Sequence, residues 1–251
     1  MNSNDISWLL SNPIAHRGLY DNEKNIPENS EMAFKAAIKQ KYMIELDVQV
    51  IKDHRVIVFH DDNLKRMCDE KKDVTELGDD YKIYELLGTK QIIPLLDEVL
   101  QLVNGTVPLL IDIKSNFAFK KSNMVILNTL LGYTGHVAIL SFNPWVLRWF
   151  AIHAPTIPRG QLASKFTGVK LNVMLKFLLR NFAFNFLAKP HFIGYDVKDL
   201  PARPVERQRK RGKIVLGWGV DSMEAAEKYA AFCDNIIFEN FIPSSQSLKG
   251  H

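Results

Sequence analysis

Two carboxylates share one face of a short apolar run at residues 44–48, which read IELDV. Glu45 and Asp47 are two positions apart, so on a β-strand their side chains point one way while the apolar side chains point the other way. Anions on a covered face of a sheet carry a large desolvation cost unless a cation or hydrogen-bond donors meet them. A divalent metal ion is the simplest such partner, and the pair therefore predicts a metal site.

Two histidines stand where apolar runs end. His16 is followed by Arg17 in the segment IAHRG, and His60 ends an apolar run in VFHDD. Near neutral pH, one imidazole can accept a proton from an attacking hydroxyl while another donates a proton to a departing oxygen. Beside a metal ion, this pair of side chains is suited to the cleavage of a phosphodiester.

A further strand-like run, LLIDIK, repeats the pattern of the acidic one. On a strand, Asp112 and Lys114 share one face, which adds a carboxylate and a cation at the same end. Oxygen ligands at this density favour Mg²⁺, Ca²⁺ or Mn²⁺ over a soft metal. With Arg17 and Lys114 beside it, such an ion makes a positive site that would hold a phosphate group.

Eight apolar runs of strand type, most of them separated by helical patterns, follow one another along the 251 residues. This alternation predicts parallel strands joined by right-handed crossovers, and the length matches the ~250 residues of a (β/α)8 barrel, whose catalytic groups lie at the carboxyl ends of the strands. We therefore predict an α/β fold, a (β/α)8 TIM barrel that forms a single domain over residues 1–251. The predicted strands are 13–16, 43–48, 107–113, 136–141, 158–163, 192–197, 213–219 and 235–239, and the clearest predicted helices are 31–40, 95–103, 119–131, 144–153, 169–187, 203–211 and 222–232.

One connection departs from the alternation. Residues 48–52 and 56–59 are both of extended type, and only three residues separate them. A turn this short can only form an antiparallel hairpin. We therefore predict a β-hairpin extension after the second strand, which returns His60 to the acidic strand end, and a small insertion over residues 61–91 before the second helix.

Composition is that of an ordinary globular protein, with a net charge of +4. The basic run at residues 203–213 is interpreted as a solvated helix face, and we infer no nucleic-acid binding from it. Cys68 and Cys233 are far apart, which fits a reducing compartment. The first residues have no secretory signal pattern, so we predict a cytoplasmic location. The sequence leaves the oligomeric state open.

Residues 173–188, within the segment 169–188, are apolar enough to raise the question of a membrane segment. Polar residues interrupt the stretch at 176, 180, 181 and 185, and it is shorter than the ~20 apolar residues that a span requires. An amphipathic helix is expected instead. It either packs on the sheet of the barrel, which is the interpretation we favour, or makes a peripheral contact with lipid through its aromatic side chains. These are Phe177, Phe182, Phe184 and Phe186.

The motifs HRG, PENS, ELDV, HD and IDIK, in this order and at these separations, resemble the glycerophosphodiester phosphodiesterase family. The resemblance implies a TIM barrel with a divalent ion held by Glu45, Asp47 and Asp112. It implies His16 and His60 as the acid/base pair and phosphate contacts from Arg17 and Lys114. It also implies glycerol 3-phosphate and an alcohol as products. A family mechanism in which the glycerol 2-hydroxyl attacks would make His16 the base and His60 the acid, and the reverse assignment stays open.

The sequence also departs from the family pattern. Asp112 stands where the family usually has Glu, and the late motif reads Trp218-Gly219-Val220-Asp221 where Trp-Thr-Val-Asn is usual. These changes bear on the choice of substrate more than on the chemistry. Phe142 and Trp218 are expected to be apolar walls against the glycerol or the alcohol, with plain barrel core as the rival interpretation.

Three smaller alternatives stay open. Glu28, in the PENS motif, either lies near the metal site or only helps to begin a helix. Asp61 either orients His60 or caps a turn. The whole chain is a glycerophosphodiester phosphodiesterase, a lysophospholipase D-like enzyme that captures lipid, or a barrel that binds a phosphodiester or metal without catalysis. The two histidines disfavour the last interpretation, because a pure binder needs no pair of proton-transfer groups.

Overall fold

The computed structural model describes residues 5–114 and 119–243, and the chain divides into two compact units. One unit comprises residues 15–137, and the other comprises residues 1–14 together with 138–251. We refer to them as the 15–137 unit and the 138–251 unit and describe each by itself. The prediction of a single domain over residues 1–251 stays a prediction.

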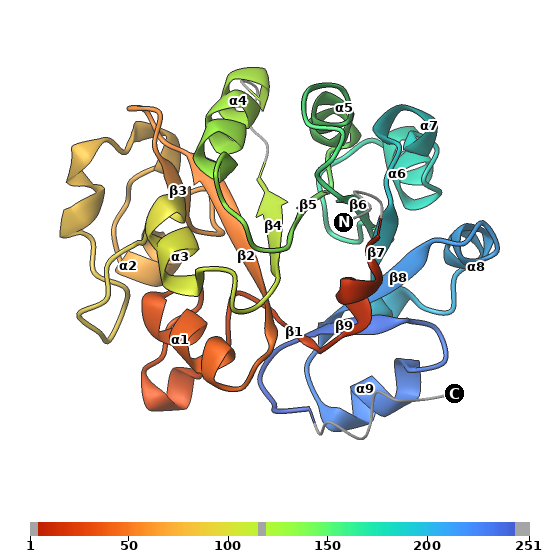
Figure 1. The fold of residues 1–251 in the computed structure, drawn as a ribbon, viewed down its shortest axis with the longest axis horizontal. Coiled ribbons are helices and arrows are strands. Elements are labelled where there is room, and N and C mark those ends of the chain that lie inside the picture. The colour runs from red at the N-terminus through yellow and green to blue at the C-terminus, as the bar shows by residue number, and fades with distance from the viewer. Residues whose placement is uncertain (1–4, 115–118, 244–251) are drawn as a thin grey trace. The chain divides into compact units, whose positions relative to one another are not determined.

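The 15–137 unit is built around β2, its longest strand (Figure 1). On one side β2 pairs in parallel with β4, and on the other it pairs with β3 as an antiparallel hairpin. In that hairpin Val48 lies opposite Val58 and Val50 opposite Val56, which confirms the predicted extension. The elements are β1 (Ile14–Ala15), which begins in the other unit, η2 (Asn22–Lys24), α1 (Glu31–Lys39), β2 (Met43–Val50), β3 (Val56–Val58), α2 (Lys65–Cys68), η3 (Val74–Glu76), η4 (Asp79–Ile83), α3 (Leu96–Val103), β4 (Leu109–Ile113) and α4 (Phe119–Leu130).

The insertion over residues 61–91 has a small apolar core of its own. Leu64, Leu77 and Tyr81 are buried there, in one cluster with Ile51 and Ile57 of the hairpin. A stretch with many charges is thus held in place by the apolar residues between those charges. This packing fixes the position of helix α2, which contributes a residue to the candidate active site.

The 138–251 unit contains parallel strands that pair in the order of the chain, β5 to β9. Both faces of a parallel sheet are usually covered, and the burial of β6 at every position agrees with this. The elements are η1 (Ser7–Leu10), β5 (Val137–Ser141), α5 (Pro144–His153), β6 (Arg159–Ala163), α6 (Val173–Arg180), α7 (Asn185–Ala188), β7 (Phe192–Asp196), η5 (Val197–Asp199), α8 (Arg203–Arg209), β8 (Ile214–Val220), α9 (Met223–Tyr229) and β9 (Asn235–Phe238).

Within the described residues, the order of elements is that of the (β/α)8 TIM barrel, as the sequence predicts. Strands β1, β2 and β4 to β9 supply the eight parallel strands, and β3 is the hairpin addition. The observed strand ends lie within two residues of the predicted ones. Most predicted helices agree to a similar degree, and the last one is three residues shorter at its end.

The prediction of one helix over residues 169–187 is wrong. The structure has two helices, α6 and α7, and residues 169–172 precede the first. Asn181 ends α6, and its side-chain amide donates to the Phe177 carbonyl at 2.7 Å. Phe182 then takes a left-handed φ of 57° and is buried, with its ring 5.8 Å from that of Tyr195. The chain therefore turns where an aromatic side chain enters the core.

None of the helices in residues 5–114 and 119–243 is long and apolar enough to cross a membrane. This agrees with the prediction that residues 169–188 do not span a bilayer.

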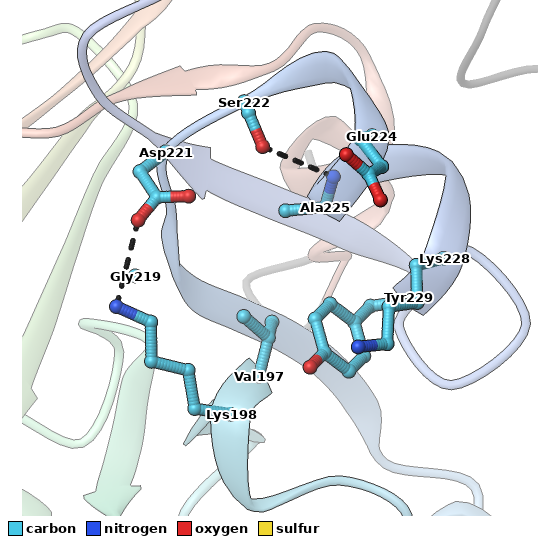
Figure 2. A pocket seen from close by; sticks show the side chains of 9 residues that line it. All are labelled: Val197, Lys198, Gly219, Asp221, Ser222, Glu224, Ala225, Lys228 and Tyr229. Carbon is cyan, nitrogen blue, oxygen red and sulfur yellow. Dashed lines mark hydrogen bonds and ion pairs between the residues drawn. The ribbon is translucent and has the colours of Figure 1, made fainter.

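A surface cleft in the 138–251 unit lies between η5 and the start of α9 (Figure 2). Lys198 and Asp221 form an ion pair of 3.5 Å at one side, and the Ser222 hydroxyl accepts from the Ala225 N–H at 3.2 Å and so begins α9. The lining contains Gly219 and Asp221 of the late motif but none of the residues predicted to catalyse the reaction, contact the substrate or bind the metal. It consists of Val197, Lys198, Gly219, Asp221, Ser222, Glu224, Ala225, Lys228 and Tyr229.

Candidate active site

The turn after β1 brings His16 and Arg17 to the end of β2. Arg17 has a φ of 56° and Gly18 a φ of 79°, so the chain reverses tightly there. A Cβ atom at Gly18 would lie 2.9 Å from the Ala33 Cβ atom, so glycine is required for this close approach to α1. The Arg17 N–H donates to Glu45 Oε2 at 3.0 Å, and His16 Nε2 lies 3.9 Å from the same oxygen.

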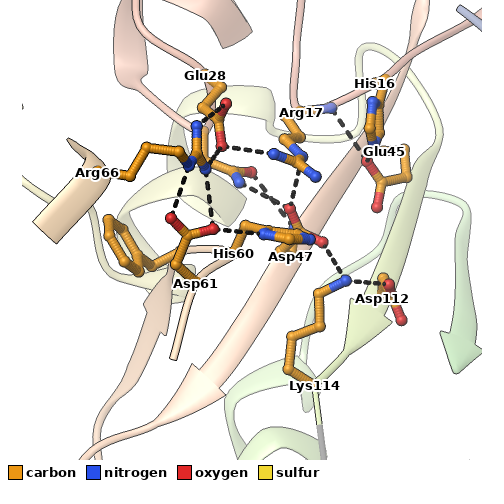
Figure 3. Close-up of polar contacts among 12 residues, drawn as sticks. His16, Arg17, Glu28, Glu45, Asp47, His60, Asp61, Arg66, Asp112 and Lys114 are labelled. Atoms are coloured by element: carbon orange, nitrogen blue, oxygen red, sulfur yellow. Dashed lines mark hydrogen bonds and ion pairs between the residues drawn. The ribbon is translucent and has the colours of Figure 1, made fainter. Parts of the chain in front are cut away.

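Three carboxylates converge at the ends of β2 and β4 (Figure 3). Asp47 and Asp112 are direct neighbours in the parallel register, and Glu45 lies two residues before Asp47 on the same face. One oxygen of each side chain lies within 4.8 Å of the others, and all three residues are buried. The structure thus brings together the three residues that the sequence proposes as metal ligands.

Two cations compensate part of this negative charge. Lys114 Nζ lies 2.8 Å from Asp47 Oδ1 and 2.6 Å from Asp112 Oδ2. Arg17 Nε lies 3.2 Å from Asp47 Oδ2. Three carboxylates against two cations leave one net negative charge in the group.

The cations act unequally on the three carboxyl groups. Burial and the charge of Asp47 raise the pKa of Glu45 to about 7, and burial raises the pKa of Asp112. Burial also opposes ionisation of Asp47, but Lys114 and Arg17 hold its pKa below the usual range. Asp112 Oδ1 is buried without a hydrogen-bond partner among the described residues. Two under-compensated carboxyl groups beside an ionised one fit a divalent cation bound by oxygen.

His60 stands just after β3 and is held from two sides. The Gln49 side-chain amide donates to the carbonyl oxygens of Phe59, His60 and Asp61 at 3.0, 3.3 and 2.8 Å, which fixes the backbone. His60 Nδ1 lies 2.7 Å from Asp61 Oδ1. Because the Asp61 carboxylate only accepts, Nδ1 carries the hydrogen and Nε2 is the other ring nitrogen available for chemistry. Burial lowers the pKa of His60, which favours the neutral imidazole.

Arg66, on α2 of the insertion, joins the two halves of this site. Its guanidinium donates to both oxygens of Asp61 at 2.7 and 2.9 Å and to both oxygens of Glu28 at 2.6 and 2.8 Å. Glu28 also accepts from Arg17 at 2.6 Å. Glu28 therefore lies between two arginines rather than within the group of three carboxylates, and Asp61 lies where it can orient His60.

Sequence reasoning missed Arg66 and Asn29. The Asn29 side-chain amide donates to Asp47 Oδ2 at 2.9 Å from a backbone with a φ of 53°, while Ser30 is the residue that caps α1. The PENS motif carried a signal for Asn29, because the neighbouring Glu28 was already singled out. Arg66 gave none, since it stands in a run of mixed charges beside Lys65, which only pairs with Asp69 on the surface.

The two aromatic residues predicted to line the mouth lie together in the 138–251 unit. The ring centroids of Phe142 and Trp218 are 5.8 Å apart in an edge-to-face arrangement, and Phe166 packs on Phe142 at 6.0 Å. Gln161, in the middle of β6, donates to the carbonyl oxygens of Ser141 and Phe142 at 3.1 Å each. Ring contacts and amide hydrogen bonds therefore order the residues after β5, while the Lys198–Asp221 ion pair lies just beyond β7 and β8.

Comparison with known proteins agrees with the resemblance in the motifs. The model of the glycerophosphoryl diester phosphodiesterase family matches residues 16–241. A glycerophosphodiester phosphodiesterase of Caldanaerobacter subterraneus subsp. tengcongensis is 28% identical over 244 residues, which cover 90% of this chain and 93% of that protein.

Two other relatives match over shorter stretches. A glycerophosphodiester phosphodiesterase of Bacillus altitudinis is 41% identical over 110 residues, 40% of this chain and 43% of that protein. The human lysophospholipase D GDPD1 is 36% identical over 126 residues, 43% of this chain and 38% of that protein.

A solved structure shares the fold. A phosphodiesterase of Oleispira antarctica in complex with the product sn-glycerol-3-phosphate superposes with a TM-score of 0.76 at 18% identity, covering 91% of this chain and 92% of that one. Since the family model spans most of the chain, the chain belongs to the glycerophosphoryl diester phosphodiesterase family of enzymes.

Proposed function

We propose that this protein hydrolyses glycerophosphodiesters to glycerol 3-phosphate and an alcohol in a metal-dependent reaction. The observation that carries the proposal is the group of three buried carboxylates, Glu45, Asp47 and Asp112, with His16 and His60 beside it in the 15–137 unit. Membership of the family and the product bound by the Oleispira antarctica phosphodiesterase support the same substrate class.

Glu45, Asp47 and Asp112 would hold the divalent cation, Mg²⁺ or Ca²⁺ with Mn²⁺ as a third choice. Such an ion would stabilise the negative charge that develops on the phosphoryl oxygens during the reaction. Arg17 and Lys114 supply the other positive charges of the site, and we assign them contacts with the phosphate. Both side chains are partly accessible while they hold Asp47, so they can turn donors toward a ligand.

The geometry supports His60 as the base and His16 as the acid, the reverse of the first assignment made from the sequence. A neutral His60 whose Nδ1–H is held by Asp61 presents the lone pair of Nε2, which can accept the proton of the glycerol 2-hydroxyl. His16 Nε2 lies 3.9 Å from Glu45 Oε2, and we assign His16 the role of the acid. His16 can donate a proton to the alcohol oxygen as the bond from phosphorus to that oxygen breaks.

In this mechanism the attack of the 2-hydroxyl gives a cyclic glycerol phosphate and releases the alcohol. Water then opens the ring, with the two histidines in exchanged roles, so that each ends in its starting protonation state. Phe142 and Trp218 are proposed to meet the glycerol or the alcohol through their rings.

The proposal is tested by hydrolysis of glycerophosphocholine, with glycerol 3-phosphate measured before and after chelation and with Mg²⁺, Ca²⁺ or Mn²⁺ added back. Activity that is lost on chelation, restored by an ion and abolished in His16→Ala supports it. The matched control is His54→Asn at an exposed turn with a φ of 64°, which asparagine tolerates. Full activity in the presence of chelator, or in His16→Ala, rejects the proposal.

A second candidate is hydrolysis of lysophospholipids in the manner of a lysophospholipase D. The match to the human lysophospholipase D GDPD1 and the exposed apolar side chains of α6 favour it. Comparison of kcat/KM for lysophosphatidylcholine and glycerophosphocholine decides between the two substrates. A non-catalytic binding role would instead give tight binding of glycerol 3-phosphate with no turnover of either compound.

A further inference from the structure

Helix α6 leaves some of its apolar side chains uncovered. It reads VMLKFLLR, with six apolar residues among eight, and no residue of the helix is buried. Helix α3 has the same length and buries Leu96, Val99, Leu100 and Val103. Among its described residues, the 138–251 unit therefore covers α6 only in part, and Leu175, Leu178 and Leu179 are half-buried.

The most exposed of these side chains lie on one side of the helix. Val173, Met174 and Phe177 occupy positions i, i+1 and i+4 and expose 85%, 65% and 50% of their surface. Phe186 on α7 exposes 72%. Together with Val169 and Leu171 in the preceding loop, these residues form what we call the α6–α7 patch. Exposed apolar groups of this size and number indicate a surface that contacts something else.

The charged residues of the segment that carries the patch are basic, and Lys165 among them is paired with Asp199 outside the segment. Residues 164–195 contain no Asp or Glu and five basic residues. The Arg180 guanidinium lies over the Phe177 ring at 5.2 Å from its centroid, so a cation and an apolar group share the same side of α6. The basic residues are Lys165, Lys170, Lys176, Arg180 and Lys189.

We propose that the α6–α7 patch docks this protein on the surface of an anionic lipid bilayer. The apolar side chains would enter the boundary between headgroups and acyl chains, while the lysines and Arg180 meet the anionic headgroups. A second copy of the chain is a poorer partner, because a two-fold contact through the patch would set these cations against the same cations. The docking is separate from hydrolysis and uses none of the residues proposed for it.

The apolar part of the contact is tested by co-sedimentation of the full chain with vesicles of phosphatidylcholine, with or without phosphatidylglycerol. Removing Met174 and Phe177 together by substitution with serine is expected to lower binding to the anionic vesicles at least about tenfold. The matched control is Ile83→Ser in the 15–137 unit, where 71% of the isoleucine is exposed. It is expected to bind like the unaltered chain.

The charged part of the contact is tested by the double variant Lys170→Glu with Lys176→Glu. The control is Lys210→Glu, which changes an exposed residue of the basic run at 203–213, outside the patch. Loss of each cation is expected to weaken binding to anionic vesicles about fivefold, and added salt is expected to weaken it further. Circular dichroism checks that each variant is folded without using enzymatic activity.

Three results would overturn the proposal. The unaltered chain could fail to bind anionic vesicles, or it could bind neutral vesicles equally well. The variants in the patch could bind as well as their controls. Finally, analytical ultracentrifugation could reveal a dimer that Met174→Ser with Phe177→Ser abolishes, in which case the patch is an interface between subunits.

Discussion

The strand ends of the two units are stabilised in opposite ways. In the 15–137 unit, β2 and β4 carry Glu45, Asp47 and Asp112, whose charges are partly neutralised by arginine and lysine. In the 138–251 unit, β5 and β8 end near Phe142 and Trp218, which pack through ring contacts. The first unit has the groups that we propose for proton transfer and metal binding, and the aromatic pair of the second has side chains suited to shaping a ligand site.

This comparison predicts that the largest effect on turnover comes from the imidazoles of the 15–137 unit. His60→Asn is expected to lower kcat by about a thousandfold, because the neutral imidazole that accepts the proton is lost. Binding of glycerol 3-phosphate, measured by calorimetry with metal present, should change little. If the variant keeps more than a tenth of the activity, His60 does not transfer the proton, and the proposed difference between the two units is wrong.

The next effect concerns the metal. Asp112→Asn is expected to weaken binding of Mn²⁺ or Ca²⁺ about a hundredfold, because it removes one of three anionic ligands. Calorimetry measures this without substrate, and Asp73→Asn in the insertion is the matched control for loss of one carboxylate in the same unit. Equal metal affinity in Asp112→Asn and the control would mean that the group of three carboxylates is not the metal site.

The carboxylate charges that serve this site have a cost in stability when metal is absent. Glu45 has a pKa of about 7 in the folded chain and about 4.5 when unfolded. Its protonated form therefore favours folding fully below pH 4.5, and this contribution is lost as the pH rises through 7. The loss amounts to about 3 kcal/mol between these limits.

Glu45→Gln should remove that dependence. In chelator, the free energy of unfolding of the unaltered chain is expected to fall from pH 5 to pH 8 relative to that of Glu45→Gln, as measured by urea denaturation. The difference between the two chains at each pH cancels the contribution of the other titrating groups. Parallel curves over this range would show that Glu45 is ionised equally in both states.

Arg66 connects the insertion to the acidic site of the 15–137 unit through Asp61 and Glu28. Arg66→Met is expected to lower kcat about tenfold and to shift the pH profile, because Asp61 loses the partner that holds it against His60. Arg66→Lys should recover part of the activity, since it keeps the charge but not the paired hydrogen bonds. Lys65→Met is the control. A fall in thermal stability with an unchanged pH profile would assign Arg66 a structural role only.

The contrast between the units also explains which site residues could be placed from the sequence. The carboxylates could be placed from the sequence because alternation on β2 and β4 fixes their face, and parallel register then sets Asp47 beside Asp112. Contacts between distant loops carry no such periodicity. Arg66 reaches Glu28 across 38 positions, and only the packing of the insertion decides that it does.

The split of the predicted helix over residues 169–187 has a similar cause. The amphipathic pattern continues across Asn181 and Phe182, so it gives no sign of a break. The break arises because burial of Phe182 against Tyr195 outweighs continuation of the helix. Periodicity therefore predicted that the segment is helical, and tertiary packing decided where the helix ends.

The smallest expected effect concerns the aromatic side chains of the 138–251 unit. Phe142→Ala is expected to raise KM severalfold and to leave kcat nearly unchanged, because a ring that only meets the substrate contributes equally before and during the reaction. Trp145→Ala, an exposed tryptophan of the same unit, is the control with soluble glycerophosphocholine as substrate. A hundredfold fall in kcat with constant KM would instead give the 138–251 unit a part in the chemistry, and the division between charged and aromatic strand ends would no longer describe the enzyme.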